Sequence, residues 1–240
     1  MNSQLIRAAV AGACGKMGKI AVQAIEQAPD LDLVAKIVRG DDFEEALTSS
    51  GADVVVDFTT PQFVDRHLRR AVELGIHPVI GTTGLNSDSL AFSKSLAAES
   101  SLGGVVAPNF AVGAVLMERL SREVSRHFSA VEIIEAHHPD KKDVPSGTAL
   151  RTREVICEST RKGTEEISIH SIRLPGYVAS QEVIFGGLGE RLSIRHDSFD
   201  RQCYAPGILI AVRAAPQLDR LVCDLGTLLF SETDRCRTTS

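Results

Sequence analysis

The sequence has no excess of positive charge and no long apolar run. Its 26 lysine and arginine residues are outnumbered by 31 aspartate and glutamate residues, which gives a formal net charge of −5. Non-specific binding to nucleic acid depends on a basic surface, so we expect no nucleic-acid partner. No apolar stretch approaches the roughly 20 residues that a membrane-spanning helix needs, so we expect no membrane partner either.

The chain also lacks the cysteine patterns of a disulfide framework or a zinc site. It has five cysteines, and none of them forms a C-x-x-C pair. The odd number and scattered positions are typical of a reducing compartment, so we expect a cytoplasmic location and no bound metal. A short apolar stretch after Arg7 resembles part of a signal peptide, but it runs into a glycine-rich turn and is predicted to be a first strand.

Strand-like and helix-like segments alternate up to about residue 109. Buried strands are predicted for "LIRAAVA", "LDLVAKIV", "ADVVVDF", "HPVIGTTG" and "GGVVAPNF", with helices after the first, the third and the fourth. Such alternation indicates a parallel, doubly wound α/β sheet, and continuous apolar strands indicate a sheet covered on both faces.

The pattern changes beyond residue 109. The segments "EISIHSIRLPG", "SQEVIFGG" and "ERLSIRHDS" show the two-residue alternation and glycine turns of an open antiparallel or mixed sheet. Helical stretches near residues 111–128 and after "VPSGTAL" accompany them, which is typical of an α+β domain. We therefore expect one domain from residues 1–109 and 216–240, and a second from residues 110–215.

Three glycines lie at the junction of the first predicted strand and helix, in "VAGACGKMG". Gly12, Gly15 and Gly18 allow a tight turn, and they let backbone N–H groups approach a pyrophosphate at the positive end of the helix. The spacing departs from the strict G-x-G-x-x-G pattern and is a weak signal by itself. Its position in an alternating chain favours a dinucleotide, and no Gly-Lys-Ser/Thr follows that would indicate a P-loop.

The end of the second predicted strand, "KIVRGDD", bears on the choice between NADH and NADPH. An acidic side chain there binds the adenosine ribose, whereas an arginine accepts a 2′-phosphate. Arg39 therefore favours NADPH, while Asp41 and Asp42 leave NADH open. The alternative is an arginine that is simply solvated at a strand end.

The segments "GTTG" (residues 81–84) and "APNF" (residues 107–110) follow the fourth and fifth predicted strands. Open parallel sheets bind ligands beyond the carboxyl ends of their strands, where both segments meet. Glycine and threonine there can pack beneath a nicotinamide ring, and Asn109 can hydrogen-bond its amide or ribose. Ordinary turn chemistry is the alternative for each segment.

The stretch "EAHHPDKKDVPSGTAL" (residues 135–150) concentrates histidines and lysines beside a turn of small residues. Imidazole and ammonium groups can bind a carboxylate and transfer protons. Pro145 suits the first turn of a helix, whose N–H groups at Gly147 and Thr148 would face an anion. We interpret the stretch as an anion site with proton transfer. A charged surface loop, a buried pair of structural histidines and a metal site are the alternatives, and Ser146 lacks the G-x-S-x-G context of a nucleophile.

Together with "VDFTTP" and "GERLSIRH", these stretches resemble the dihydrodipicolinate reductase family, also called 4-hydroxy-tetrahydrodipicolinate reductases, of lysine and diaminopimelate biosynthesis. They occur in the family's order, and the pattern E-A-H-H-x-x-K-x-D-x-P-S-G-T-A is highly specific. The resemblance implies a Rossmann-type dinucleotide-binding domain and a second domain that binds a dicarboxylate substrate and builds a homotetramer. The implied reaction is reduction of 4-hydroxy-tetrahydrodipicolinate, by way of dihydrodipicolinate, with NADPH preferred or NADH.

The resemblance also implies roles for individual residues. His137 resembles the family's proton donor or acceptor, and Lys141 resembles its proton donor, because the family's lysine follows the first histidine by four residues. The residues that resemble carboxylate-binding positions are His138, Ser146, Gly147 and Thr148. The residues that resemble cofactor contacts are Gly12, Ala13, Cys14, Gly15, Lys16, Met17, Arg39, Gly81, Thr82, Thr83, Ala107, Pro108, Asn109 and Phe110. Arg201 resembles a further substrate-side arginine, and Val38 stands where many members carry an acidic residue, which favours NADPH.

Two other functions fit parts of the sequence. A nucleotide-binding redox sensor or regulator could use the glycine-rich turn without turnover, but it needs no cluster of proton donors. Another NAD(P)-dependent oxidoreductase, for instance one that acts on amino acids, is the second alternative. A substrate with one carboxylate would need only part of the "PSGT" site.

Overall fold

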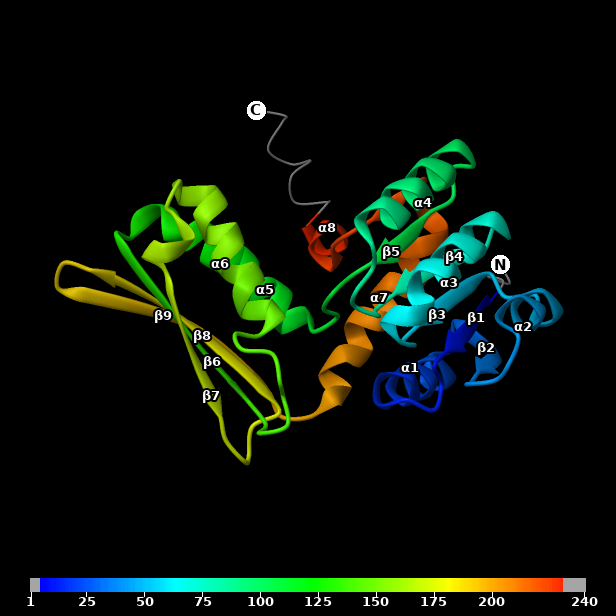
Figure 1. Ribbon diagram of the computed structural model, residues 1–240, viewed down its shortest axis with the longest axis horizontal. Coiled ribbons are helices and arrows are strands. Elements are labelled where there is room, and N and C mark those ends of the chain that lie inside the picture. Colours follow the sequence, from blue (N-terminus) through cyan, green and yellow to red (C-terminus); the bar gives the residue numbers. More distant parts are fainter. Residues whose placement is uncertain (1–4, 231–240) are drawn as a thin grey trace. The chain divides into compact units, whose positions relative to one another are not determined.

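The computed structural model describes residues 5–230, which form two compact units. The first unit ends at Phe110 and resumes at Tyr204, and the second comprises Ala111–Cys203 (Figure 1). A parallel sheet in the first unit and a mixed sheet in the second confirm the predicted fold class. Within residues 5–230, every helix is too short or too polar to span a membrane.

The first unit is built on a six-stranded sheet in which all pairings are parallel. Its strands are β1 (Ile6–Ala11), β2 (Leu31–Ile37), β3 (Val54–Asp57), β4 (His77–Ile80), β5 (Gly104–Val106) and β10 (Leu221–Val222). Its helices are α1 (Lys16–Gln27), α2 (Phe43–Ser50), α3 (Pro61–Glu73), α4 (Ser87–Glu99), α7 (Ala205–Ala214) and α8 (Leu225–Phe230), with a short 3-10 turn η4 (Ala215–Gln217). A further 3-10 turn, η3 (Arg201–Tyr204), spans the boundary between the two units. The strand order is β10-β5-β4-β3-β1-β2, so the chain adds β2 on one side of β1 and the later strands on the other side. The position between β1 and β3 is the kind of switch point at which α/β sheets bind ligands.

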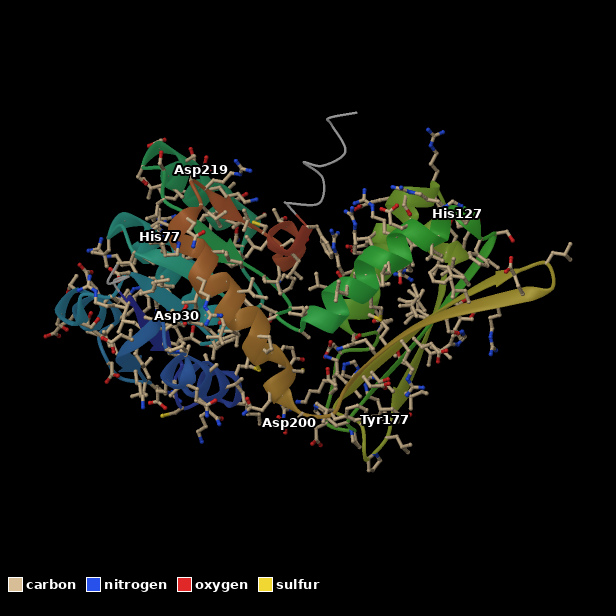
Figure 2. The ribbon with its side chains drawn as sticks, turned by 180° about the vertical axis from the view of Figure 1, so that it is seen from behind. Asp30, His77, His127, Tyr177, Asp200 and Asp219 are labelled. Atoms are coloured by element: carbon tan, nitrogen blue, oxygen red, sulfur yellow. The ribbon has the colours of Figure 1, made fainter. Side chains whose placement is uncertain are left out.

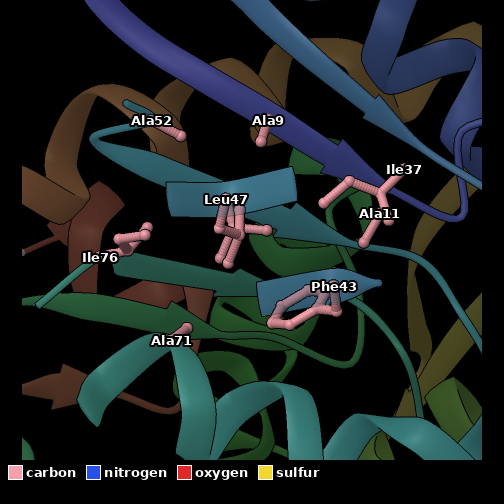
Figure 3. Close-up of a cluster of buried hydrophobic side chains, with 9 residues drawn as sticks. Ala9, Ala11, Ile37, Phe43, Leu47, Ala52, Ala71 and Ile76 are labelled. Atoms are coloured by element: carbon pink, nitrogen blue, oxygen red, sulfur yellow. The ribbon is translucent and has the colours of Figure 1, made fainter. Parts of the chain in front are cut away.

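Short, continuous apolar strands form this sheet. Residues Ala8–Ala11 and Val54–Asp57 are all fully buried. Side chains alternate between the two faces of a strand, so both faces of the sheet are covered, as the apolar strands predict. Figure 3 shows one part of this core, where Ala9 of β1 and Leu47 of α2 belong to the same cluster of buried side chains.

The helix α7 belongs to the first unit, although the sequence pattern places residues 110–215 in one domain. It packs against α1, and Arg213 near its end donates two hydrogen bonds to Asp30 (2.7 and 2.8 Å), a residue labelled in Figure 2. A Cβ on Gly207 would lie 2.0 Å from the carbonyl oxygen of Phe110, so the helix also touches the end of the preceding segment of this unit. The chain therefore returns to the first unit at Tyr204 rather than at residue 216.

The helix α2 is a further difference from the sequence-based expectation, which contains no helix there. Asp42 caps it by accepting hydrogen bonds from the N–H groups of Glu44 and Glu45 (both 2.9 Å). Gly51 ends it with a φ of 62°. These are ordinary start and stop signals, but a helix of 8 residues offers little apolar periodicity to detect.

The second unit is a four-stranded mixed sheet with two helices on one face (Figure 1). Its strands are β6 (Ala130–His137), β7 (Ser168–Arg173), β8 (Ala179–Gly187) and β9 (Glu190–Ser198). Its helices are α5 (Val112–Val124) and α6 (Gly147–Thr160), with 3-10 turns η1 (Ser125–His127) and η2 (Thr164–Glu166). The order is β7-β6-β8-β9, with β6 and β7 parallel and the other pairs antiparallel.

The helix-facing side of this sheet changes from apolar to polar along β6. Val131 and Ile133 belong to the apolar cluster beneath α5 and α6, whereas Glu135 and His137 follow on the same face. The parallel pairing of β6 with β7 places Arg173 beside His137. The polar end of the sheet is therefore the end from which the loop to α6 leaves.

Candidate active site

The glycine-rich turn after β1 has no room for side chains at two of its glycines. Gly12 has a φ of 78°, and a Cβ there would lie 2.5 Å from the carbonyl oxygen of Phe58. A Cβ on Gly18 would lie 2.0 Å from the carbonyl oxygen of Gly12. The start of α1 and the end of β3 thus both lie in direct contact with the turn, which only glycine permits.

Some backbone N–H groups of this turn bind the end of β2, and others lie at the start of α1. The N–H groups of Gly12 and Ala13 both donate to the carbonyl oxygen of Ile37 (2.9 and 3.2 Å). The first N–H groups of a helix have no acceptor within it, so those of Lys16 and Met17 are the donors suited to a phosphate. No acidic residue lies in the first turn of α1 to oppose an anion, and a pyrophosphate fits this position.

Arg39 follows β2 with an exposed side chain. The two acids after it bind the backbone instead: Asp41 accepts from the Val38 N–H (2.8 Å), and Asp42 caps α2. Both carboxylates therefore shape the turn, and Arg39 is the cation that the turn presents to solvent.

The loops after β4 and β5 lie at the same edge of the sheet as the glycine-rich turn. A Cβ on Gly81 would lie 2.1 Å from the ring of Phe58. Phe110 is buried, and its ring packs edge-on against the Phe58 ring, with 5.7 Å between centroids. The side chain of Phe110 thus belongs to the core, and its backbone is the part suited to a cofactor. The partly or fully exposed residues of the two loops include Thr82, Thr83, Pro108 and Asn109.

A buried carboxylate that the sequence pattern does not single out lies at the same edge. Asp57 ends β3, is fully buried, and accepts hydrogen bonds from Thr59, Thr82 and His67. Burial opposes its ionisation, but the hydrogen bonds from His67 and Thr59 lower the pKa of Asp57 below the usual value for aspartate.

In the second unit, His137 is the last residue of β6. Its Nδ1 lies 2.5 Å from Oε2 of Glu135, two residues earlier on the same face. Glu135 is fully buried, and Arg173 donates to both of its oxygens (3.0 and 2.9 Å). Burial opposes ionisation here too, but the hydrogen bonds from Arg173 and His137 lower the pKa of Glu135. An ionised carboxylate only accepts, so Nδ1 of His137 is the donor and Nε2 is left for a ligand.

The environment of His137 favours the neutral imidazole. Burial lowers the pKa of His137, and Glu135 offsets this only in part. The positive charges of Lys141 and Arg173 lower this pKa further. At neutral pH the ring therefore keeps a lone pair on Nε2, which can accept a proton.

Arg173 also holds the loop that carries Lys141. Its guanidinium donates to the carbonyl oxygens of Lys141 (3.3 Å) and Asp143 (2.8 Å) as well as to Glu135. Lys141 donates to the carboxylate of Asp143 (2.9 Å), and this contact lowers the pKa of Asp143. The side chain of Lys141 is 23% exposed, whereas the neighbouring Lys142 is an exposed residue. One arginine thus fixes the backbone of Lys141 at the end of the sheet that carries His137.

The start of α6 adds backbone donors to this end of the sheet. Ser146 is buried and caps α6, its hydroxyl accepting from the Ala149 N–H (3.3 Å). No atom lies within 4 Å of the place that a Cβ on Gly147 would occupy, so the first turn of the helix is open there. His138 is partly exposed, with Nδ1 4.0 Å from Asp140. A helix start without an acidic residue in its first turn, beside an imidazole, suits a carboxylate.

Glu135 and Arg173 are absent from the site residues expected from the sequence. Glu135 could have been found, because it lies two residues before His137 and therefore on the same face of a strand. Arg173 lies 38 residues from Glu135 in the chain, and its role depends on the pairing of β6 with β7. Arg201 begins η3, and none of the interactions described for His137 involves it.

The expected site residues fall into two groups, one in each unit. The residues expected to bind a cofactor all lie at the carboxyl edge of the first sheet, and the residues expected to transfer protons or bind carboxylates lie at the end of β6 and the start of α6. Among residues 5–230, no set of three or more histidine, cysteine, aspartate or glutamate side chains is placed to hold a metal ion.

Comparisons with known proteins agree with the resemblance seen in the motifs. The family profiles described as "Dihydrodipicolinate reductase, N-terminus" and "Dihydrodipicolinate reductase, C-terminus" match residues 6–110 and 113–229. A 4-hydroxy-tetrahydrodipicolinate reductase of Coxiella burnetii is 44% identical over 237 residues, which covers 93% of this chain and 99% of that protein. The corresponding protein of Nocardia farcinica is 44% identical over 229 residues, or 87% and 92% of the two chains.

Solved structures give the same relationship. The dipicolinate-bound dihydrodipicolinate reductase from Paenisporosarcina sp. TG-14 superposes with a TM-score of 0.86 at 33% identity, over 93% of this chain and 99% of that one. Scyllo-inositol dehydrogenase from Lactobacillus casei has a TM-score of 0.62 at 11% identity, over 95% and 93% of the two chains, which indicates a shared fold alone.

We predict that Glu135→Gln lowers the pKa of His137 further, because Glu135 is the group that raises this pKa against the effect of burial. The pKa would be measured from the Cε1–H resonance of His137 during an NMR pH titration, with the resonance assigned by its loss in His137→Asn. Glu132→Gln is the matched control, since Glu132 is an exposed glutamate on the same strand that pairs with His170 instead. An unchanged or raised pKa of His137 in Glu135→Gln would contradict the role given to Glu135.

Proposed function

The chain belongs to the dihydrodipicolinate reductase family, and we propose that it reduces 4-hydroxy-tetrahydrodipicolinate, by way of dihydrodipicolinate, to tetrahydrodipicolinate in lysine and diaminopimelate biosynthesis. The observation that carries this proposal is the cluster at the end of β6, where Glu135 orients His137 and where Arg173 binds both Glu135 and the backbone of Lys141. A nucleotide-binding sensor would need no such proton-transfer groups. The relative from Paenisporosarcina binds dipicolinate, a dicarboxylate, which supports a substrate of that class.

The reaction requires one hydride and one proton for the double bond that is reduced. A bound nicotinamide supplies the hydride, and the protein has to manage the negative charge that develops on the substrate ring. Lys141 presents three N–H donors and one positive charge, so we assign it as the proton donor. A positive charge fixed in position before the reaction stabilises the developing negative charge without reorganisation.

His137 complements Lys141 because it offers a lone pair rather than a charge. Glu135 holds Nδ1 of His137 as the donor, so Nε2 can accept a proton and return it. We assign His137 as the proton donor or acceptor that works beside Lys141. Its tautomer is fixed because Glu135 is ionised. Burial opposes this ionisation, but the hydrogen bonds from Arg173 and His137 lower the pKa of Glu135.

We assign the substrate carboxylates to the start of α6. The N–H groups of Gly147 and Thr148 lie in the first turn of the helix, at the positive end of its dipole. The cap residue Ser146 and the partly exposed His138 complete the group of residues that we assign to the substrate carboxylates. Binding of two carboxylates by fixed donors would orient the ring as well as retain it.

We propose NADPH as the preferred cofactor, with NADH as the alternative. Arg39 is exposed at the end of β2, where the adenosine ribose binds in sheets of this kind. The nearby carboxylates of Asp41 and Asp42 already accept hydrogen bonds from backbone N–H groups, which supports a site for the 2′-phosphate rather than for a free ribose hydroxyl.

We also propose a cytoplasmic location. The cysteines among the described residues, Cys14, Cys157, Cys203 and Cys223, are free thiols. Reducing compartments keep thiols in this state. Burial raises the pKa of the Cys157 thiol, which makes that thiol less reactive.

We propose further that the second unit builds a homotetramer through the face of its sheet that α5 and α6 leave uncovered. Ile134, Ile172 and Ile184 alternate with inward residues and so lie on this face, and Ile172 is 40% exposed. Branched apolar side chains on an open sheet face are typical of a contact surface.

We predict that Lys141→Ala lowers kcat by roughly 100-fold or more, the scale of losing a general acid. Lys142→Ala is the matched control and should be mild, since Lys142 is exposed beside it. The measurement is NADPH oxidation with enzymatically generated 4-hydroxy-tetrahydrodipicolinate. Equal losses in both variants would contradict the role of Lys141, and no turnover of this substrate by the unmodified protein would contradict the proposed function.

We predict that Arg39→Ala weakens NADPH binding by about 1.5–3 kcal/mol, the value of a charge-assisted contact, and weakens NADH binding little. Only NADPH carries the 2′-phosphate that the guanidinium would bind. Dissociation constants for both nucleotides would be measured from their fluorescence on binding. The same loss for both would show that Arg39 does not distinguish them.

We predict that the protein elutes with a mass near four times the 25.8 kDa of one chain when size-exclusion chromatography is combined with light scattering. Ile172→Glu should lower that mass, because it places a charge on the uncovered sheet face. A mass of one chain for the unmodified protein would contradict the tetramer.

A further inference from the structure

Asp57 lies at the switch point of the first sheet. It pairs with Ala11 of β1 on one side and with Ile80 of β4 on the other. The glycine-rich turn therefore begins beside Asp57 on one flank, and the loop that contains Thr82 begins beside it on the other. Burial of a carboxylate at this place is unfavourable unless both oxygens are supplied with donors.

The two oxygens of Asp57 accept hydrogen bonds from three residues. Oδ1 accepts from the N–H of Thr59 (2.8 Å), from the Thr59 hydroxyl (2.7 Å) and from the Thr82 hydroxyl (2.9 Å). Oδ2 lies 2.7 Å from Nδ1 of His67. Burial opposes ionisation of this carboxylate, but the hydrogen bonds from His67 and Thr59 lower the pKa of Asp57. The carboxylate is thus ionised at neutral pH. Nδ1 of His67 is therefore the donor.

Aromatic packing fixes the orientation of His67. The Phe43 ring lies parallel to the imidazole with 3.9 Å between centroids, and the Phe63 ring lies on it with 5.8 Å between centroids. His67 is only 9% exposed. Since α2 carries Phe43 and α3 carries Phe63 and His67, two helices hold Oδ2 of Asp57 and so turn Oδ1 toward the loops.

The hydroxyls that donate to Asp57 have a defined polarity. A hydroxyl has one hydrogen, so the oxygens of Thr59 and Thr82 are left as acceptors only. Both threonines are partly exposed. The carboxamide N–H groups and ribose hydroxyls of a nicotinamide nucleotide are donors, and they match such acceptors.

The order of the strands places these acceptors on the nicotinamide side of a dinucleotide. Arg39, at the end of β2, marks the adenosine end, and the glycine-rich turn after β1 marks the pyrophosphate. The sheet continues from β1 to β3 and then to β4, after which Thr82 stands. Thr82 is therefore on the far side of the pyrophosphate from Arg39.

Phe58 links the same loops through packing. Its N–H donates to the carbonyl oxygen of Ala11 (3.0 Å), and its own carbonyl oxygen lies against Gly12. Its ring covers Gly81 and meets the ring of Phe110. A displacement at the end of β3 would therefore move the loops after β1, β4 and β5 together.

From these contacts we propose that Asp57 is a positioning residue for the nicotinamide half of the cofactor. It acts through the hydroxyls of Thr59 and Thr82, which it holds as acceptors toward the nucleotide. This assignment rests on the proposed function in one respect, that the first unit binds NADPH or NADH.

The test compares the binding of NADPH with that of 2′,5′-ADP, a fragment that carries the adenosine, the 2′-phosphate and one 5′-phosphate but lacks the nicotinamide half. Asp57→Asn keeps the size of the side chain, but its NH2 group cannot accept a hydrogen bond. By isothermal titration calorimetry, the Kd for NADPH should rise roughly 10- to 100-fold while that for 2′,5′-ADP changes by less than about twofold. Asp53→Asn is the matched control, because Asp53 precedes the same strand at its other end and pairs with Arg7 (2.8 Å). It should leave both Kd values unchanged.

Selective loss of NADPH binding in Asp57→Asn supports the assignment. An unchanged Kd for NADPH overturns it, and so does an equal loss for both ligands, which would indicate a general disturbance of the unit. If Asp57→Asn does not fold, Thr82→Val removes a single hydroxyl and decides the question in the same way: a selective loss supports the assignment, and no loss overturns it. Failure of the unmodified protein to bind NADPH would instead contradict the proposed function.

Discussion

A carboxylate buried at the end of a strand has to be surrounded by hydrogen-bond donors, and this requirement organises both units. In the second unit Glu135 accepts from Arg173 and His137, and in the first unit Asp57 accepts from His67 and two threonines. Each carboxylate takes donors from segments that are distant in the chain. Arg173 also binds the backbone of the loop that carries Lys141, and Thr82 lies in the loop after β4, so neutralising each buried charge also fixes a loop that carries expected site residues.

The second unit can bind a dianion because positive charge is concentrated at one place in it, although the net charge of the chain is negative. The chain carries a net charge of −5, yet Lys141 and Arg173 converge at the end of β6, near the positive end of α6. Part of this charge is already compensated, since Arg173 pairs with Glu135 and Lys141 pairs with Asp143. The compensation keeps both cations in place without a ligand and leaves Lys141 with further N–H donors to offer.

The features that could be predicted from the sequence are those that depend on neighbours in the chain. Strands that alternate with helices predict the first sheet, and the two-residue alternation of side chains predicts the second. The glycine-rich turn and the "HHPDKK" and "PSGT" stretches mark the expected site regions, because each is a local pattern. Arg173 and Asp57 could not be predicted in this way. Arg173 is 38 residues from Glu135, and Thr82 is 25 residues from Asp57, so both contacts exist only once parallel strands have paired. The residue at which the chain re-enters the first unit, Tyr204, also depends on contacts between distant segments, since α7 is placed by its contacts with α1 and Asp30.

The pairing of β10 with β5 has a consequence for the order of events during synthesis. Leu221 and Val222 complete the first sheet by pairing with Gly104 and Val105, but the ribosome makes them only after the whole of Ala111–Cys203. The second unit is continuous and can fold as it emerges, whereas the first waits with β5 as an unpaired edge. Unpaired edges pair readily with strands of other chains, and a β5 of only 3 residues offers them little to pair with. The shortness of this strand thus protects the nascent chain during the interval in which its first unit is incomplete.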